Sequence, residues 1–140
     1  MIVLDTDCLS LLNRERIVEA SSLQRRLDEF PIDELFTTIV TFEEQMRGWL
    51  AFIARSRTLK EEIFAYEMLH HSLKTFRNTN VLDFDEPAAA ELAKLKAAKI
   101  RVGTMDLKIA AIAIANNAIL VTRNLVDFEK VPGLNAQDWT

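Results

Sequence analysis

Cysteine, glycine and proline are scarce in this sequence of 140 residues, which has one cysteine, three glycines and three prolines. Cys8 has no second cysteine with which to form an internal disulfide or a metal site, so we expect a small buried side chain. With so little glycine and proline, there is little material for flexible linkers or for the many turns of an all-β sandwich. The composition therefore favours long helices, in an α/β or an all-α protein.

Long apolar runs are also missing from the chain. No stretch approaches the roughly 20 residues that a membrane-spanning helix needs. The apolar residues 1–4 lead directly into Asp5 rather than into a signal-peptide core, so we expect a cytoplasmic protein with no membrane contact. With 49% hydrophobic and 27% charged residues, the chain has the balance of one compact domain with its own core.

An excess of positive charge is missing too, because the formal net charge is −4. Proteins that bind nucleic acid tightly usually carry a basic surface, so this charge counts mildly against an RNA partner. Cations held by carboxylates, however, reverse the local field at the place where a phosphate binds. The net charge therefore does not decide whether the partner is a nucleic acid.

Short apolar runs alternate with helical patterns along the chain. Runs of strand-forming residues predict strands at 1–4, 35–40, 81–84 and 118–121. Helical spacing and capping residues predict helices after Asp5, from Ile17 to Phe30, from Thr41 onward, at 85–99 and at 103–117. Strands that alternate with helices favour an α/β fold with a parallel sheet covered on both faces.

The longest helical region lies at about residues 46–76. Its pattern fits two antiparallel helices joined near Ser56 to Thr58. Both helices carry apolar residues, and we expect each of these to lie in the core. His70 and His71 are adjacent, so a helix points them in different directions, and we expect neither to bind metal.

Four carboxylates fall where the predicted strands end or the following helices begin: Asp5, Glu44, Asp106 and Asp127. In an open parallel sheet, ligands bind in the crevice beyond the carboxyl ends of the strands. Carboxylates gathered there repel one another unless hard cations such as Mg²⁺ or Mn²⁺ lie between them. Each of the first three alone also suits a helix start, but the joint pattern predicts a metal site.

Each of the four carboxylates lies within its own short sequence segment. Segment 2–9 reads IVLDTDCL, segment 41–48 reads TFEEQMRG, segment 103–111 reads GTMDLKIAA and segment 121–128 reads VTRNLVDF. In order, spacing and flanking apolar residues, these segments resemble the four motifs of PIN domains of the VapC toxin type. The resemblance extends to about Leu134, and it aligns the family's glutamate with Glu44 rather than Glu43. It implies a PIN-like three-layer α/β/α sandwich around a central parallel sheet.

The same resemblance implies a chemical function. It indicates an endoribonuclease, the toxin of a type II toxin–antitoxin pair, which hydrolyses RNA phosphodiester bonds by metal-activated water. Asp5 and Asp106 would be the principal ligands of Mg²⁺ or Mn²⁺, while Glu44 and Asp127 complete the catalytic site directly or through water. Thr122 and Asn124 would orient those ligands by hydrogen bonds. Asp7 stands where many relatives have Asn, and either touches the metal or caps a helix.

Basic residues and partners complete this hypothesis. Arg47, Lys108 and Arg123 lie near the motifs and are candidates for contacts with RNA phosphates. For any one of them, a solvent-exposed surface charge without such a contact is the simpler interpretation. The resemblance also implies a cognate VapB-like antitoxin that occupies the groove and suppresses cleavage. It further implies a homodimer, for which the apolar residues of helices at 49–76 are interface candidates.

Two other functions fit parts of the sequence. A strand followed by Asp5-Thr6-Asp7 also imitates the nucleophile motif of haloacid-dehalogenase-like phosphatases, in which Asp5 would form an aspartyl phosphate. Against it, Cys8 stands where that family usually has glycine, and segment 103–106 is not its paired-acid motif. A non-catalytic PIN-like domain that binds RNA or protein is disfavoured because all four motif acids are present.

Overall fold

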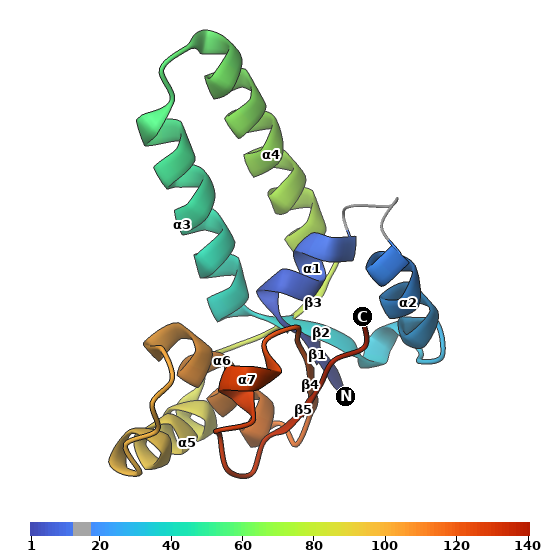
Figure 1. Ribbon diagram of the computed structural model, residues 1–140, viewed down its shortest axis with the longest axis vertical. Helices are drawn as coiled ribbons and strands as arrows, with labels where there is room; N and C mark the ends of the chain where they lie inside the picture. The colour runs from blue at the N-terminus through green and yellow to red at the C-terminus, as the bar shows by residue number, and fades with distance from the viewer. Residues whose placement is uncertain (13–17) are drawn as a thin grey trace.

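Five parallel strands form the centre of the molecule in a computed structural model, which describes residues 1–12 and 18–140 (Figure 1). They are β1 (Ile2–Leu4), β2 (Leu35–Thr38), β3 (Asn80–Leu82), β4 (Ile119–Val121) and β5 (Asn135–Gln137). Their order across the sheet is β3-β2-β1-β4-β5, and each neighbouring pair is parallel. The chain adds strands on one side of β1 first and on the other side later. The carboxyl ends of β1 and β4 therefore lie side by side where the strand order reverses.

Helices connect the strands. They are α1 (Thr6–Leu12), α2 (Val18–Leu27), α3 (Ile39–Arg55), α4 (Leu59–Arg77), α5 (Glu86–Ala97), α6 (Thr104–Ala115), α7 (Leu125–Phe128) and the 3₁₀ helix Ile32–Glu34. Ile17, where we expected the second helix to begin, lies outside the described residues. No helix in the described part of the chain is long and apolar enough to cross a bilayer.

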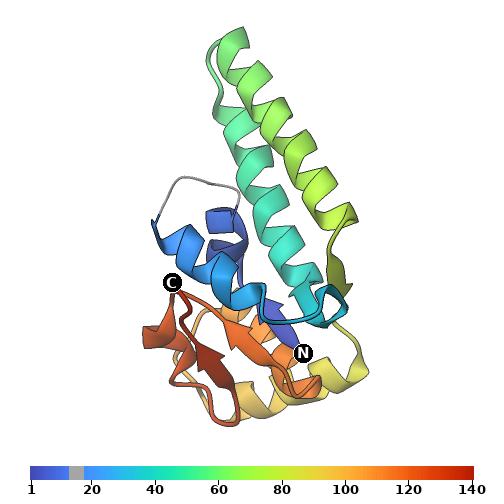
Figure 2. The same cartoon turned by 90° about the vertical axis from the view of Figure 1, so that its right-hand side faces the viewer.

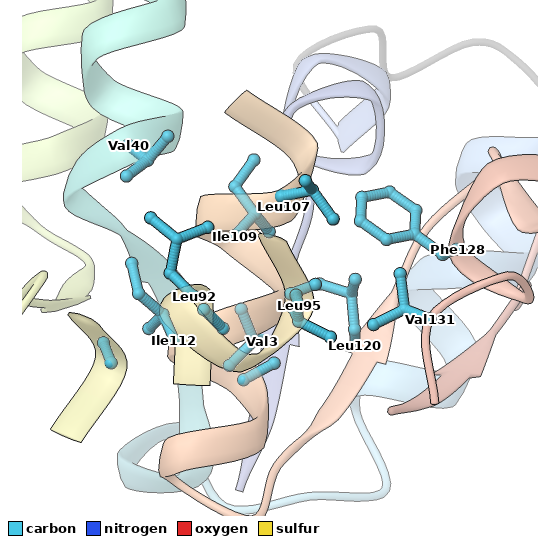
Figure 3. Close-up of a cluster of buried hydrophobic side chains, with 14 of the residues drawn as sticks. Val3, Val40, Leu92, Leu95, Leu107, Ile109, Ile112, Leu120, Phe128 and Val131 are labelled. Carbon is cyan, nitrogen blue, oxygen red and sulfur yellow. The ribbon is translucent and has the colours of Figure 1, made fainter. Parts of the chain in front are cut away.

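The sheet separates two hydrophobic cores, which gives the three-layer α/β/α fold expected from the sequence (Figures 1 and 2). Side chains alternate between the two faces of a strand. Val3 and Leu120 pack against α5, α6 and α7, as Figure 3 shows with Ile109, Ile112 and Phe128. The opposite core, under α1 and α2, contains the strand residues Ile2, Leu4 and Val121 together with Cys8. Cys8 is buried as predicted, and burial raises the pKa of its thiol to about 12.

The boundary between β2 and α3 differs from the prediction. We expected the strand to reach Val40 and Thr41 to cap the helix, but β2 ends at Thr38 and α3 begins at Ile39. Thr38 is the cap, because its hydroxyl accepts a hydrogen bond from the Thr41 N–H at 3.0 Å. The two threonine hydroxyls also form a hydrogen bond of 3.0 Å. The cap gives the Thr41 N–H, in the first turn of the helix, a hydrogen-bond partner. These bonds outweigh the strand propensity of the β-branched run from Thr37 to Thr41.

Helices α3 and α4 project together from the body as a hairpin joined by residues 56–58 (Figures 1 and 2). The rings of Trp49, Phe52 and Phe64 contact one another between the two helices, with centroids 5.9–6.3 Å apart. Several large apolar side chains of the hairpin, Phe64 among them, are 48–77% exposed: Leu50, Leu59, Ile63, Phe64, Tyr66 and Leu73. The expectation that these residues lie in the core is wrong, because this part of the hairpin extends beyond the sheet and has no layer to pack against.

Candidate active site

Asp5 follows β1 directly, at the point where the strand order reverses. Its backbone N–H donates to the carbonyl of Val121 at 3.0 Å, which continues the β1–β4 pairing past Leu4. One carboxylate oxygen, Oδ1, accepts from the Thr6 N–H at 2.7 Å, and Oδ2 accepts from the Thr122 hydroxyl at 2.9 Å. Asp5 is 5% exposed. The end of the central strand thus holds a nearly buried carboxylate in one fixed orientation.

The loop and helix after β4 link Thr122 to Asp127. The backbone N–H of Asn124 donates to Oγ1 of Thr122 at 3.0 Å, which leaves the Thr122 hydroxyl hydrogen to point at Asp5. The Asn124 side-chain amide donates to Oδ2 of Asp127 at 3.0 Å, and the Lys130 ammonium donates to Oδ1 at 3.3 Å. These hydrogen bonds, with that of Asn124 the stronger, lower the pKa of Asp127. Asp127 is therefore a charged carboxylate at the outer side of the site.

Helix α3 brings Glu44 close to Asp5 and Thr6. The Thr6 hydroxyl donates to Oε2 of Glu44 at 3.3 Å, while Oε1 is buried and has no hydrogen-bond partner among the described residues. The neighbouring Glu43 instead forms a salt bridge with Arg47 at 2.6 Å on the exposed surface of α3. Of the two adjacent glutamates, Glu44 is the one that faces the site.

Burial and mutual repulsion raise the pKa of three of these carboxylates. For Asp5 the pKa rises to about 6, mainly because of burial and further because of Asp106 and Asp7, despite the opposing hydrogen bonds from Thr122 and Thr6. For Glu44 the pKa rises to about 7, again mainly by burial, with Asp5 and Asp106 adding to it. Burial, Asp127 and Asp7 raise the pKa of Asp106. The structure thus brings Asp5, Glu44 and Asp106 within electrostatic reach of one another, with Asp127 beside Asp106.

The donor set fits a divalent cation by its chemistry. Carboxylate and hydroxyl oxygens are the hard ligands that Mg²⁺ and Mn²⁺ prefer, and Oε1 of Glu44 is a buried acceptor with no hydrogen bond within the described part of the chain. Among those residues, no three His, Cys, Asp or Glu side chains form a group arranged to hold an ion. Magnesium usually keeps several waters and binds through one or two carboxylates, so a ready-made protein cage is not required.

The basic residues singled out from the sequence lie in two places. Arg47 and Lys108 line one groove of about 460 Å³ together with apolar residues of α3 and Phe84. Arg123 lines a separate polar hollow of about 400 Å³ with Asp7 and Ser10. Arg123 is therefore the one of the three that shares a concave surface with an acidic residue of the site.

Two further residues contact the site although the sequence analysis did not select them. Thr6 donates its backbone N–H to Asp5 and its hydroxyl to Glu44, and Lys130 binds Asp127. Thr6 could have been predicted from the sequence, because a hydroxyl directly after Asp5 at a helix start is placed to bind neighbouring carboxylates. Lys130 could not, because its only sequence feature is the i, i+3 spacing from Asp127, and ordinary surface ion pairs have the same spacing.

Comparison with known proteins decides the family. The sequence model of the PIN domain matches residues 2–134. The chain belongs to the PIN-domain family. This PIN domain is 30% identical to ribonuclease VapC1 of Haemophilus influenzae over 144 aligned positions, covering 99% of the chain and 97% of the relative.

Solved structures agree with this assignment. The PIN domain superimposes on VapBC-1 from nontypeable Haemophilus influenzae with a TM-score of 0.70 and 29% identity, covering 99% of the chain and 98% of that structure. DNA-bound VapBC from Salmonella typhimurium has the same fold, with a TM-score of 0.73, 22% identity and coverage of 99% and 98%. The family and fold expected from the four motifs are confirmed.

Membership of the PIN-domain family contradicts the haloacid-dehalogenase alternative.

Proposed function

We propose that this PIN domain is a divalent-metal-dependent endoribonuclease and the toxin of a type II toxin–antitoxin pair. The observation that carries the proposal is the convergence of Asp5, Glu44 and Asp106 from three distant segments, with the pKa of each raised. A fold gains no stability from placing carboxylates in this way, whereas a bound cation explains it. The likeness to ribonuclease VapC1 over nearly the whole chain supports the same chemistry.

In this proposal Asp5 and Asp106 hold Mg²⁺ or Mn²⁺, and Glu44 and Asp127 complete the site directly or through water. The bound cation would polarise the RNA phosphate, stabilise the attacking and leaving oxygens and activate a water molecule. The protein's own contribution is orientation. Thr122 and Thr6 fix the two oxygens of Asp5, and Asn124 fixes Asp127.

Phosphate contacts are proposed for the basic residues near the site. Arg123 is the best placed, because the hollow that it lines also contains Asp7. Arg47 and Lys108 lie along the groove beside α3, where they would contact a more distant part of the RNA backbone. Backbone contacts of this kind position a nucleic acid without reading its sequence.

We propose two protein partners, a cognate VapB-like antitoxin and a second copy of the chain. Structural neighbours include a toxin–antitoxin complex from Klebsiella pneumoniae as well as the VapBC assemblies named above. The hairpin offers the surface for such contacts, because exposed apolar side chains of α4 line a groove of about 550 Å³ that includes Leu59, Ile63 and Tyr66. We propose a single PIN domain with this hairpin as its extension, acting in the cytoplasm, where RNA and antitoxin would be present.

Expression of the protein in growing bacteria tests the proposal. We expect the wild-type chain to arrest growth and to leave cut RNA in the cell extract, and the Asp5→Asn variant to do neither while keeping its circular dichroism spectrum. Asp33→Asn is the matched control, because Asp33 is exposed and precedes β2, at the end of that strand away from the site. Growth arrest by Asp5→Asn equal to that by the wild type would contradict the proposed site.

A further inference from the structure

We infer that Gln45 is a positioning residue for Glu44, because its side-chain amide ties α3 to both α1 and α4 next to the site. The inference concerns the same site as the proposed nuclease function and rests on that function for its activity measurement.

Two side-chain hydrogen bonds join α1 to α3. The Thr6 hydroxyl donates to Glu44 at 3.3 Å, and Nε2 of Gln45 donates to Oγ of Ser10 at 3.2 Å. Thr6 and Ser10 are four residues apart, so they lie on the same face of α1, one turn from each other. Two bonds one turn apart fix the separation of the helices and also their relative tilt, which a single bond leaves free.

A third hydrogen bond extends the connection to α4. The hydroxyl of Ser72, which is 5% exposed, donates to Oε1 of Gln45 at 3.4 Å. The amide of Gln45 therefore donates toward α1 and accepts from α4. A glutamine amide carries a donor and an acceptor at the same end of the side chain, so it can bond both serines at once.

Glu44 depends on this connection because little else holds its side chain. Its carboxylate receives one hydrogen bond among the described residues, from Thr6, and its second oxygen has none. The start of α3 is anchored by the Thr38 cap, and its later part projects with α4 as the hairpin (Figure 2). In the part of the chain that the structure describes, Gln45 makes the last side-chain hydrogen bond from α3 to the body.

The first test replaces the amide with a hydrocarbon of similar size. We expect Gln45→Leu to lower the single-turnover rate of RNA cleavage about tenfold, a typical loss when a residue that orients a ligand is removed. Ser10→Ala should lower the rate in the same direction. Gln24→Leu is the matched control, because Gln24 is exposed and its side chain donates to nearby Asp28 on the surface. An unchanged rate in Gln45→Leu would overturn the inference.

A double-mutant cycle separates positioning of Glu44 from a general structural effect. If Gln45 acts through Glu44, the variant carrying both Glu44→Gln and Gln45→Leu cleaves no more slowly than Glu44→Gln alone. A purely structural role would instead multiply the rate by the same factor in both backgrounds, and that result would overturn the inference.

The rise in unfolding temperature on adding Mn²⁺ gives a second readout that needs no RNA. We expect Gln45→Leu to reduce this rise in the wild-type background and to leave it unchanged in Glu44→Gln. If the wild type cleaves no RNA, the proposed function fails. The Mn²⁺-induced rise in unfolding temperature, compared between the wild-type and Glu44→Gln backgrounds, then decides the role of Gln45. A wild-type chain with no response to Mn²⁺ would overturn the inference as well.

Discussion

Opposing forces on single carboxylates determine the chemistry of this site. Asp5 receives hydrogen bonds on both oxygens, which favour its charged form, yet burial and nearby acids outweigh them and raise its pKa to about 6. Asp127 is half-buried and bonds Asn124 and Lys130, so its pKa is lowered. The inner carboxylates therefore bind protons more readily than the outer one, and a cation would compete with those protons.

Without metal, the protein should become less stable as the pH rises from about 5 to 8. Asp5 and Glu44 have pKa values of about 6 and 7 in the folded state, above the ordinary values of 3.8 and 4.5. The folded state therefore binds more protons than the unfolded state in this range, and stability is lost as the pH passes through the folded pKa values. The unfolding temperature in chelator should fall by a few degrees.

The control for this pH dependence is Glu44→Gln, which removes one of the two groups and should flatten the curve. Adding Mn²⁺ should restore stability at the alkaline end, where both carboxylates are charged. An unfolding temperature that rises with pH in chelator would contradict the pKa shifts.

Removing the Thr122 hydroxyl should weaken metal binding about tenfold. Thr122→Val keeps the shape of a fully buried side chain but deletes the hydrogen bond to Oδ2 of Asp5 and the one accepted from the Asn124 N–H, so the pKa of Asp5 should rise further. Titration calorimetry with Mn²⁺ measures the affinity. Thr75→Val is the control, since among the described residues that hydroxyl bonds only the carbonyl of His71 in its own helix. Equal affinity in Thr122→Val and wild type would show that the hydrogen bond has no role in orientation.

Individual site residues were predictable to different degrees. The spacing of the motif distinguished Glu44 from Glu43, and the structure shows the reason, since Glu43 pairs with Arg47 on the outer surface. The roles of Thr6 and Gln45 depend on which helices meet. Periodicity within one segment does not report those contacts.

At the scale of elements, strands were predictable where they are buried and apolar. β1 and β4 lie at the centre of the sheet and consist of apolar residues, whereas β5 reads Asn-Ala-Gln and was missed. An edge strand pairs on one side only and needs no apolar alternation, so its formation depends on β4 being there already. The start of α3 was misplaced for a related reason, because the capping bond of Thr38 competes with local strand propensity.

Loss of the Thr38 cap should destabilise the protein by about 1–2 kcal/mol, the upper part of the range for helix caps. Thr38→Ala removes a fully buried hydroxyl that bonds both the backbone and the side chain of Thr41. Thr58→Ala removes the equivalent cap of α4, which is exposed and can be replaced by water. Urea unfolding of both variants checks the difference, and a larger loss in Thr58→Ala would refute the explanation.

At the scale of the molecule, the two-core sandwich and the projecting hairpin differ in how far their apolar side chains are buried. The sandwich followed from the alternation of strands and helices. The exposure of the hairpin did not, because an apolar helix face has the same sequence pattern whether it meets the core, solvent or a partner.

Substitutions in the two regions should therefore differ in their effect on stability. Leu92→Ala, in the core beneath α5, should cost about 2–5 kcal/mol of unfolding free energy. Ile63→Lys, on the hairpin at 60% exposure, should change it by less than about 0.5 kcal/mol. Chemical unfolding of the isolated chain measures both. A large loss in Ile63→Lys at a concentration where the chain is monomeric would contradict the exposed position of this residue.

The most direct test of the nuclease assignment is cleavage of a structured RNA pool by purified wild-type and Asp106→Asn protein, each with Mg²⁺, with Mn²⁺ and with chelator. The account predicts that the wild type cuts RNA only when a divalent metal is present and that Asp106→Asn, though folded, does not cut it. Equal cutting by the variant, or cutting by the wild type in chelator, would contradict a metal-dependent site built on these carboxylates.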